Sequence, residues 1–516
     1  MAHTRRIFQI LFLILFFFLF AANEFEAVSG ISLPLTLFLD LDPLLSISTF
    51  LASHSFYMNF LYGLITIALA VLLGRIFCGW ICPLGTLNNM AGYLRRFITT
   101  ARKSVERNRR LLSLKYYILF FVLAAAVLGW NASGLIDPIP MLTRSLAVGT
   151  DPVVSNLITS ALNSLSSMDI PLVSGVSDSV LDTLKGSLIP YTKPIFRQSL
   201  IIGLIFLAVL ILNLFVPRFW CRYLCPLGAF LGLVGSGQTL ARIRINEDRC
   251  VECGMCNRVC QGEANPYPEI AERECIKCFN CHEVCPSDAI EIYNGKTKME
   301  KDDVDIERRW LLTSCLGAFA AAAAVKAGVN TGRAHPERIR PPGSLPEPEF
   351  LERCVKCGEC MKVCVTNGLQ PSLNQAGFAG LWTPILVPKI GYCEYQCNLC
   401  SQVCPTGAIR DISMEEKQST SIGLAWIDRN RCLPHVAGLN CGVCEEHCPA
   451  PGKAIRFEEV ETTGSGDYEF VLKKPYIVQS LCIGCGICEN KCVITDLPAI
   501  RVTSSNESRG DNRIFL

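Results

Sequence analysis

This sequence has few histidines and almost no net charge. The 516 residues include six histidines, and the formal net charge is only +2. Before residue 250 the histidines are His3 and His54, and neither lies inside an apolar run. This argues against a haem b held by two histidines within a membrane. The near-neutral charge offers no clustered basic surface of the kind that nucleic-acid binding needs, so no nucleic-acid partner is expected.

Cysteine, by contrast, is abundant. The chain has 29 cysteines, an odd and large number that fits metal ligation better than the disulfide framework of a secreted protein. Half of the residues are apolar, and the length allows about three domains. A hydrophobic half ends and a cysteine-dense half begins near Cys250, so we expect a membrane part followed by metal-binding domains.

Two groups of four cysteines between Cys250 and Pro286 share the spacing C-x2-C-x2-C-x3-C. The pattern is typical of ferredoxins with two [4Fe–4S] clusters, because three closely spaced thiolates wrap one cube and the fourth reaches the neighbouring cube. Zinc sites usually take two C-x2-C pairs separated by a longer loop, and disulfides within so short a run would be strained. We therefore expect one cluster on Cys250, Cys253, Cys256 and Cys285, and another on Cys260, Cys275, Cys278 and Cys281.

The last third of the chain carries four more groups of four cysteines. Two keep the standard spacing, and two widen the first gap to three and to eight residues. An Ala-Ile pair after several of the fourth cysteines predicts the closing strand of a ferredoxin hairpin, with its apolar side chain inward. The spacing leaves open whether fourth cysteines are exchanged between successive groups or between outer and inner ones. The expected iron ligands are Cys354, Cys357, Cys360, Cys364, Cys393, Cys397, Cys400, Cys404, Cys432, Cys441, Cys444, Cys448, Cys482, Cys485, Cys488 and Cys492.

Four apolar runs predict membrane-spanning helices, since each approaches the length of about 20 residues that a span needs. The loop 23–55 has no Lys or Arg, whereas the segment 75–110 is rich in arginine. The positive-inside rule then places the N-terminus, this segment and the first ferredoxin unit in the cytoplasm, and the loop 131–194 outside. The four runs are Ile7 to Ala22, Phe56 to Leu73, Leu114 to Trp130 and Leu200 to Val216.

One sequence motif occurs twice in the predicted membrane domain. The segment RIFCGWICPLG, from Arg75, recurs as RFWCRYLCPLG, from Arg218, and each copy follows the second helix of a predicted hairpin. The repeat predicts two tandem hairpins of the same orientation. On a continuing helix the C-x3-C spacing puts both sulfurs on one face. A catalytic site at the cytoplasmic surface, or alternatively a set of buried structural thiols, is expected at Cys78, Cys82, Cys221 and Cys225. Metal binding, dithiol cycling and contact with quinone remain open roles.

Arg308 and Arg309 precede an Ala-rich run that ends near Val325. The segment resembles a twin-arginine (Tat) export signal in an internal position, and an ordinary Ala-rich soluble helix is the alternative. Export after cluster insertion would keep the cysteines of the last third from forming disulfides outside. Cleavage after the run and a lasting anchor are both compatible with the sequence. The Pro-rich stretch from His335 to Phe350 predicts an extended linker.

With its motifs in this order, the chain resembles a fusion of two ferredoxin-type subunits, NapH and NapG, of the electron supply to periplasmic nitrate reductase. Residues 1 to about 300 resemble NapH, with four spans, two C-x3-C-P motifs and a two-cluster ferredoxin. The rest resembles NapG, with a twin-arginine leader and four cysteine groups. The resemblance implies the electron-transfer component of a quinol dehydrogenase, with the membrane quinone pool as donor and a periplasmic terminal reductase or cytochrome as acceptor.

The sequence thus predicts a multidomain protein, with an all-α membrane domain of two tandem helical hairpins and four spans, followed by α+β ferredoxin-like [4Fe–4S] domains with six clusters. We expect a multi-pass protein of the inner (cytoplasmic) membrane with its last block in the periplasm. Two other functions stay open: a membrane ferredoxin for metal reduction, respiratory-enzyme assembly or redox regulation, and a polyferredoxin that faces the cytoplasm throughout. The predicted divisions are 1–245 for the membrane domain, 246–300 for the two-cluster ferredoxin, 301–349 for the twin-arginine segment and linker, and 350–516 for the four-cluster block.

Overall fold

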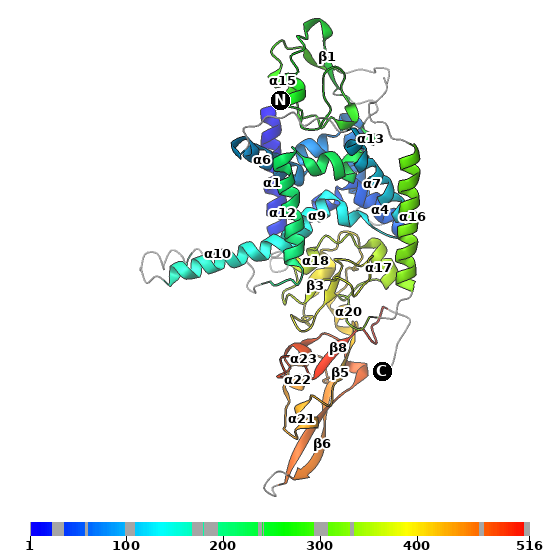
Figure 1. Ribbon diagram of the computed structural model, residues 1–516. Helices are drawn as coiled ribbons and strands as arrows, with labels where there is room; N and C mark the ends of the chain where they lie inside the picture. The colour runs from blue at the N-terminus through cyan, green and yellow to red at the C-terminus, as the bar shows by residue number, and fades with distance from the viewer. Residues whose placement is uncertain are drawn as a thin grey trace. The chain divides into compact units, whose positions relative to one another are not determined.

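The chain divides into two compact units (Figure 1). The first unit contains Met1–Leu146 and Leu200–Ala324, and the second contains Ala147–Ser199 and Val325–Leu516. Each unit therefore combines two separate parts of the sequence, which differs from the four consecutive domains predicted. The computed structural model describes residues 2–22, 36–56, 60–98, 109–167, 179, 194–235, 240, 242–293, 308–330, 335–463 and 469–509. Part of the predicted charge pattern, namely Glu24, Glu26, Arg102, Lys103 and Arg107, lies outside these residues.

The first unit consists of helices that carry a small ferredoxin domain. Two π-helical turns, η1 (Phe77–Ile81) and η3 (Trp220–Leu224), occupy equivalent places in the duplicated motif. A helix follows each turn and begins at proline, whose fixed φ suits a first helical turn. The helices are α1 (Ala2–Ala22), α3 (Leu37–Asp40), α4 (Pro43–Ser53), α5 (Phe60–Leu73), α6 (Pro83–Ile98), α7 (Arg109–Val127), α8 (Ser133–Ile136), α9 (Pro138–Arg144), α12 (Ser199–Phe215), α13 (Pro226–Val234) and α16 (Arg308–Asn330).

The four predicted spans fall on α1, α5, α7 and α12, and of these the described part of α5 is shorter than its predicted run. Within the described residues, the stretch His3–Ala22 alone is long and apolar enough to cross a bilayer. The apolar parts of the others are Phe60–Leu73, Leu111–Val127 and Ser199–Phe215. At 1.5 Å per residue, the 17 residues of α12 reach about 26 Å, less than the bilayer core of about 30 Å. The prediction of four full-length spans is therefore not supported.

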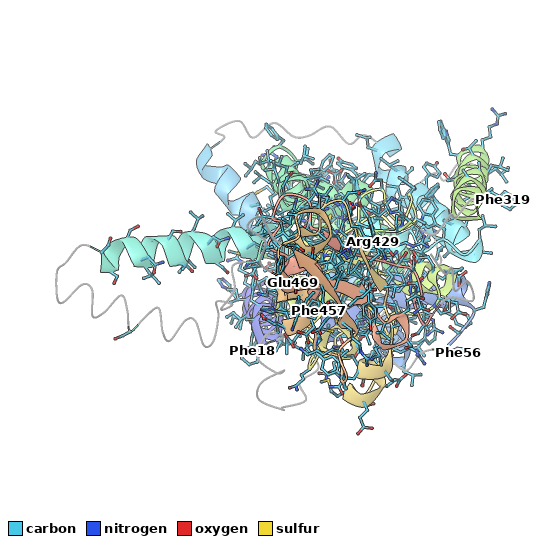
Figure 2. All side chains as sticks on the ribbon, turned by 90° about the horizontal axis from the view of Figure 1, so that it is seen from below. Phe18, Phe56, Phe319, Arg429, Phe457 and Glu469 are labelled. Atoms are coloured by element: carbon cyan, nitrogen blue, oxygen red, sulfur yellow. The ribbon has the colours of Figure 1, made fainter. Side chains whose placement is uncertain are left out.

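Large apolar side chains nevertheless cover the outer faces of these helices. Ile7 on α1 is 64% exposed, and Leu200 on α12 is 71% exposed. Figure 2 shows Phe319 at the outer edge of α16, where it is 61% exposed. On α16 the small residue Ala318 is buried, whereas Leu312 and Leu316 are exposed. Exposed apolar side chains that gather on one face are typical of surfaces that meet a membrane or a partner.

The ferredoxin domain of the first unit begins earlier than predicted. Strand β1 (Arg242–Ile245) pairs antiparallel with β2 (Ile290–Tyr293), so the domain starts at Arg242 and not at residue 246. Ile243 and Ile290 are both buried in its core. Short helices between the strands carry the cysteines: η4 (Glu247–Arg249), α14 (Met255–Arg258), η5 (Glu272–Glu274) and α15 (Asn280–Val284).

The second unit contains three two-stranded antiparallel sheets, β3–β4, β5–β8 and β6–β7. All four Ala-Ile pairs are buried, and three of them begin or immediately precede a strand: β2, β6 and β8. The fourth, Ala408-Ile409, forms an isolated bridge to Ser344 instead. The strands of this unit are β3 (Leu369–Pro371), β4 (Pro384–Leu386), β5 (Leu424–Ile427), β6 (Ile455–Thr463), β7 (Glu469–Ile477) and β8 (Ile500–Thr503). Its helices are η2 (Ser145–Thr150), shared with the first unit, α10 (Asp151–Ser166), α17 (Glu347–Arg353), α18 (Glu359–Lys362), α19 (Leu399–Gln402), α20 (Met414–Ser419), α21 (Leu433–Val436), α22 (Val443–Glu446), η6 (Gln479–Leu481) and α23 (Ile487–Asn490).

The Pro-rich stretch from His335 to Phe350 is part of the second unit, so its prediction as an extended linker is wrong. Arg340 is fully buried and donates to Glu347 at 2.6 Å and to the backbone oxygen of Pro384 at 2.7 Å. Glu347 also accepts from Arg509 at 3.0 Å. The prolines keep this stretch extended, and the buried arginine fixes it against the rest of the unit.

We expect Glu347→Gln to destabilise the second unit. Burial opposes ionisation of Glu347, but Arg340 and Arg509 lower its pKa to about 2. Because the folded pKa lies below the ordinary value, the ion pairs stabilise the fold above about pH 4.5, and the stabilisation is lost as the pH falls toward 2. A shift of this size corresponds to roughly 3 kcal/mol at neutral pH. Denaturant unfolding at pH 7 measures it, and Glu349→Gln, at an exposed neighbour, is the matched control. Equal midpoints for both variants would contradict the expectation.

The loop before α12 also belongs to the second unit. Asn367 and Gln370 both donate side-chain hydrogen bonds to the backbone oxygen of Ile195, at 2.8 and 3.0 Å. Gln198 donates to the backbone oxygen of Pro371 at 2.8 Å. Residues that directly follow the predicted outer loop 131–194 therefore pack against the beginning of the four-cluster block.

Candidate iron–sulfur cavities and four-thiol site

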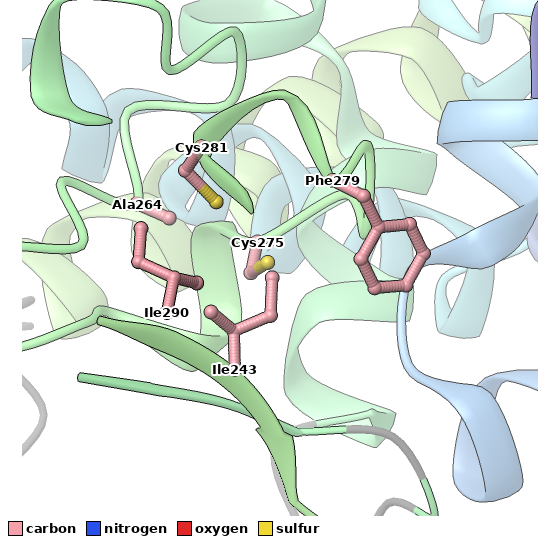
Figure 3. Packing of buried hydrophobic residues seen from close by; sticks show 6 residues of the cluster. All are labelled: Ile243, Ala264, Cys275, Phe279, Cys281 and Ile290. Carbon is pink, nitrogen blue, oxygen red and sulfur yellow. The ribbon is translucent and has the colours of Figure 1, made fainter. Parts of the chain in front are cut away.

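Two cavities of the first ferredoxin domain gather its eight cysteines. One, which we call the inner cavity, is lined by Cys260, Cys275, Cys278 and Cys281. Figure 3 shows the sulfur atoms of Cys275 and Cys281 turned toward the same space, beside Ala264, Ile243 and Ile290. The outer cavity is lined by Cys250, Cys253, Cys256 and Cys285. Each cavity thus receives three cysteines of one group and the fourth cysteine of the other.

The second unit repeats this arrangement with successive groups. Each of its cavities combines three cysteines of one group with the fourth cysteine of the group next to it in the sequence. The fourth cysteines are therefore exchanged between successive groups, and not between outer and inner groups. No cavity is described for the fourth set. Its members are Cys448, Cys482, Cys485 and Cys488, because the charge of Cys448 raises the pKa of each of the other three thiols. The three cavities are lined by Cys354, Cys357, Cys360 and Cys404; by Cys364, Cys393, Cys397 and Cys400; and by Cys432, Cys441, Cys444 and Cys492.

The backbone around the second cysteine has the same conformation in four of the six groups. The residues immediately before and after that cysteine have positive φ, and consecutive turns of this kind direct backbone N–H groups into a concave space that suits anions and iron–sulfur clusters. Four of these residues are not glycine, and each holds the conformation at a cost of about 1–3 kcal/mol. The pairs are Glu252 and Gly254, Lys277 and Phe279, Lys356 and Gly358, and Gly484 and Gly486.

The donor set of these cavities fits an iron–sulfur cluster better than a zinc ion. Burial raises the pKa of the Cys444 and Cys485 thiols to about 12, so a bound cation is needed to keep them as thiolates. In the part of the chain that the structure describes, no three His, Cys, Asp or Glu side chains are gathered closely enough for a single metal ion. Sulfurs around zinc would lie about 3.8 Å apart, given a Zn–S bond of about 2.3 Å.

The two C-x3-C-P motifs form a further site, but not on continuing helices as predicted. In each motif the first cysteine lies in a π-helical turn, and the second ends that turn and precedes the next helix. Cys225 caps α13, because its sulfur accepts from the backbone N–H of Gly228 at 3.2 Å. The break follows from proline, which has no N–H to continue the helix.

The four cysteines of these motifs nevertheless come together. Burial raises the pKa of Cys78, Cys82 and Cys225, and the charge of Cys221 raises each of them further. We call Cys78, Cys82, Cys221 and Cys225 the four-thiol site. Such mutual influence places cysteines of both repeats near one another; their role as one site stays a prediction.

Each repeat also sends an arginine toward the other. Arg218 donates to the backbone oxygen of Cys78 at 3.2 Å and to the side chain of Asn89 at 2.9 Å. Arg75 lies against Gly228, where an added Cβ would come within 2.8 Å of its guanidinium. Both arginines are buried. They stand first in the two copies of the motif, so their equivalent positions are a signal that the sequence contains and that the predicted site omitted.

A buried charge cluster joins the four-thiol site to the inner cavity. Glu274, next to Cys275, accepts from Arg75 at 3.1 Å, from Tyr116 at 2.8 Å and from Lys115. All four side chains are buried. We call Arg75, Lys115, Tyr116 and Glu274 the Glu274 cluster. Sequence reasoning missed it because its members are up to 199 residues apart.

Further contacts hold the inner cavity against the helices. Trp80, between Cys78 and Cys82, donates to the backbone oxygen of Lys277 at 3.0 Å. Arg222 donates to the backbone oxygen of Cys260 at 3.2 Å and pairs with Glu263. Gly79 leaves no room for a side chain, since a Cβ would lie 2.2 Å from the backbone oxygen of Ile276. The inner cavity is therefore the one closest to the four-thiol site, while Cys253 of the outer cavity is exposed.

Comparison with known proteins adds the following. A 4Fe-4S binding domain model matches residues 56–101 and 198–244, and a 4Fe-4S dicluster domain model matches residues 274–369. Ferredoxin-type protein NapG of Escherichia coli (strain K12) is 34% identical over 197 residues, which cover 38% of this chain and 83% of NapG. The methylamine utilization ferredoxin-type protein MauM of Paracoccus denitrificans is 34% identical over 211 residues, 40% of this chain and 89% of MauM. MauN of the same organism is 27% identical over 245 residues, 47% of this chain and 65% of MauN.

The matches to NapG and MauM cover most of each relative, and both relatives carry the description ferredoxin-type protein. Matched 4Fe-4S domain models and six sets of gathered cysteines agree with that description. The chain is an iron–sulfur electron-transfer protein and belongs to the family of ferredoxin-type proteins that includes NapG and MauM.

Proposed function

We propose that the protein takes electrons from a membrane hydroquinone at the four-thiol site and delivers them through [4Fe–4S] clusters to a terminal reductase or cytochrome. The observation that carries the proposal is the position of Arg75. Its guanidinium interacts with Cys78 of the four-thiol site and also bonds Glu274 beside the inner cavity. One buried residue therefore contacts both the proposed oxidation site and the surroundings of the first proposed electron acceptor, and it fixes their relative position.

The 24 cysteines of the six sets are the proposed iron ligands, four to each cluster. Clusters in these positions would supply one-electron storage and transfer at potentials set by hydrogen bonds and exposure. The protein contributes such bonds: the backbone N–H of Ala289 donates to Cys285 at 3.3 Å, and that of Ile409 donates to Cys404 at 3.4 Å.

We further propose that the first unit lies in the inner (cytoplasmic) membrane, where a quinone pool is available. The exposed apolar faces of α1, α5 and α12 support this, since lipid would cover them. The shorter helices reach across with their flanking residues or with local thinning of the bilayer. The N-terminal end of α1 contacts the ferredoxin domain through Arg5, which donates to Gln261 and Asn280 at 3.2 Å. This supports a cytoplasmic position for both.

For the second unit we propose a periplasmic position. Its support is the set of hydrogen bonds that Asn367, Gln370 and Gln198 make within that unit, because Ile195 and Gln198 directly follow the loop 131–194, which the charge pattern assigns to the outside. Helix α16 would carry the chain across, through export directed by Arg308 and Arg309. Its 23 residues reach about 34 Å, long enough for the bilayer core, and α16 is less apolar than His3–Ala22.

The decisive test uses the complete chain, purified without oxygen and placed in liposomes. We expect about 24 iron and 24 sulfide per chain, and reduction of the clusters when a short-chain hydroquinone is added. Two clusters with stoichiometric zinc would overturn the ligand sets. A full complement of clusters that dithionite reduces and hydroquinone does not would contradict quinol oxidation and favour a role in metal reduction or enzyme assembly.

A further inference from the structure

The first unit contains a second duplicated element besides the C-x3-C-P motif. Helix α4 follows Asp42-Pro43, and helix α9 follows Asp137-Pro138. One of these Asp-Pro helices lies before α5 and the other between α7 and α12, so each repeat contributes one. Both aspartates are fully buried.

An ordinary helix-capping role explains one of these carboxyl groups and not the other. Oδ1 of Asp42 accepts from the backbone N–H of Leu44 at 3.0 Å and of Leu45 at 3.3 Å. Asp137 makes no side-chain cap; the backbone N–H of Ile139 lies close enough to lower its pKa, but among the described residues no donor bonds either of its oxygens or Oδ2 of Asp42 with hydrogen-bond geometry. Buried carboxyl oxygens without donors are costly, so the pair needs a proton that neither aspartate's neighbours provide.

The two carboxyl groups face each other, and a shared proton satisfies them. Burial raises the pKa of Asp42 to about 6, and burial together with the Asp42 carboxyl raises the pKa of Asp137 well above its ordinary value. Two adjacent carboxylates in such a site do not both ionise, and one proton between them supplies the missing hydrogen bond.

The position of Asp137 connects this pair to the four-thiol site. Its carboxyl acts electrostatically on both Cys78 and Cys225, one cysteine from each repeat. Helix α4 contacts α13, which Cys225 caps, and α9 contacts α6, which follows Cys82. The duplicated carboxyl groups therefore lie on helices that contact the helices next to the duplicated thiols, and Asp137 acts on those thiols through its charge.

A buried chain of polar side chains lies beside the pair. Ser48 of α4 donates to Ser133 at 2.7 Å, Ser133 donates to Asn131 at 2.6 Å, and Asn131 donates to Thr49 at 3.1 Å. None of the four is exposed to solvent. The backbone N–H of Asp137 donates to the backbone oxygen of Ser133 at 2.9 Å, which places this polar chain next to the start of α9. A buried network whose members are hydrogen-bonded makes its surroundings rigid.

We propose that Asp42 and Asp137 form a proton-accepting pair that takes up protons released when hydroquinone is oxidised at the four-thiol site. The inference rests on the proposed function. A hydroquinone loses two electrons and two protons to become a quinone; the electrons go one at a time to oxidised [4Fe–4S] clusters, and the protons go one at a time to the carboxylate of the pair. The pair releases each proton to water before it takes up the next.

The test compares Asp137→Asn and Asp42→Asn with the unchanged chain in liposomes. Asn keeps the shape and caps a helix as well as Asp, so folding should survive. We expect hydroquinone-dependent cluster reduction to slow about a hundredfold, the lower range for loss of a proton acceptor, while dithionite reduction and the iron content stay unchanged. The protonated-carboxyl stretching band of the infrared spectrum should disappear in both variants, without any quinone present.

Asp40→Asn is the matched control, because Asp40 is a buried carboxyl whose donor is Thr36, at 2.7 Å. It should keep the unchanged rate and the infrared band. Equal rates in the unchanged chain and in Asp137→Asn would overturn the inference and leave quinol oxidation standing, as would an infrared band that both variants retain. An unchanged chain that hydroquinone fails to reduce would instead overturn the proposed function, and the infrared band would still decide whether the proton is shared.

Discussion

Replacing Cys78 and Cys82 together by Ala is expected to stop the reduction of the clusters by hydroquinone, with a rate at least a hundredfold below that of the unchanged chain. These residues supply half of the four-thiol site, and neither lies in a cysteine set of the ferredoxin domains. Ala removes only two small buried groups, so the fold should lose about 1–2 kcal/mol per site. Stopped-flow absorbance in liposomes measures the rate.

The control for this experiment is Cys315→Ala. Cys315 is a half-buried cysteine of α16 and belongs to none of the six sets. Its loss should leave both the rate and the iron content unchanged. Turnover that survives in the double variant would mean that the four cysteines only pack, and the proposed oxidation site would then have to be abandoned.

Glu274→Gln is expected to uncouple the ferredoxin domain from the helices. Burial opposes ionisation of this carboxyl, but Lys115 and Arg75 lower its pKa, so the folded protein holds it as a carboxylate. The ion pairs stabilise the fold above about pH 4.5, the ordinary value, and the stabilisation is lost as the pH falls below it. Gln leaves two buried cations without a counter-charge, a change that typically costs 3–5 kcal/mol.

The measurement for Glu274→Gln combines denaturant unfolding with the hydroquinone assay. We expect a lower unfolding midpoint for the first unit and at least tenfold slower reduction, while dithionite still reduces all clusters. Glu269→Gln alters an exposed carboxyl in the same loop and should change neither quantity. If the two variants behave alike, the Glu274 cluster does not couple the two sites.

Local features of this protein could be predicted from sequence, and distant ones could not. The C-x2-C-x2-C spacing fixes which three cysteines face one cavity, because it acts over a single turn of chain. Which cluster the fourth cysteine joins depends on how two such turns pack against each other. The sequence therefore did not predict the cavities to which Cys404 and Cys448 belong. The Glu274 cluster was out of reach for the same reason, since Arg75 and Glu274 meet only in the folded chain.

Composition misled the prediction in two places. Prolines around Arg340 predicted a linker, but the arginine finds Glu347 and the backbone oxygen of Pro384, and these bonds fix the segment. Apolar runs predicted four full spans, but among the described residues only His3–Ala22 is both long and apolar enough to cross a bilayer. Hydropathy reports how apolar a segment is and not where its helix stops.

The left-handed residues beside the cluster-cavity cysteines tie the abundance of this protein to the supply of iron in the cell. Glu252, Lys277, Phe279 and Lys356 hold a strained backbone, and together they cost about 4–12 kcal/mol at 1–3 kcal/mol each. That range is comparable to the whole stability of a typical domain. In a newly made chain without its iron–sulfur clusters, nothing compensates for the strain of these turns. Such a chain would unfold and be degraded by proteases. Iron starvation should therefore lower the amount of this protein in the cell, and protein without clusters should not accumulate.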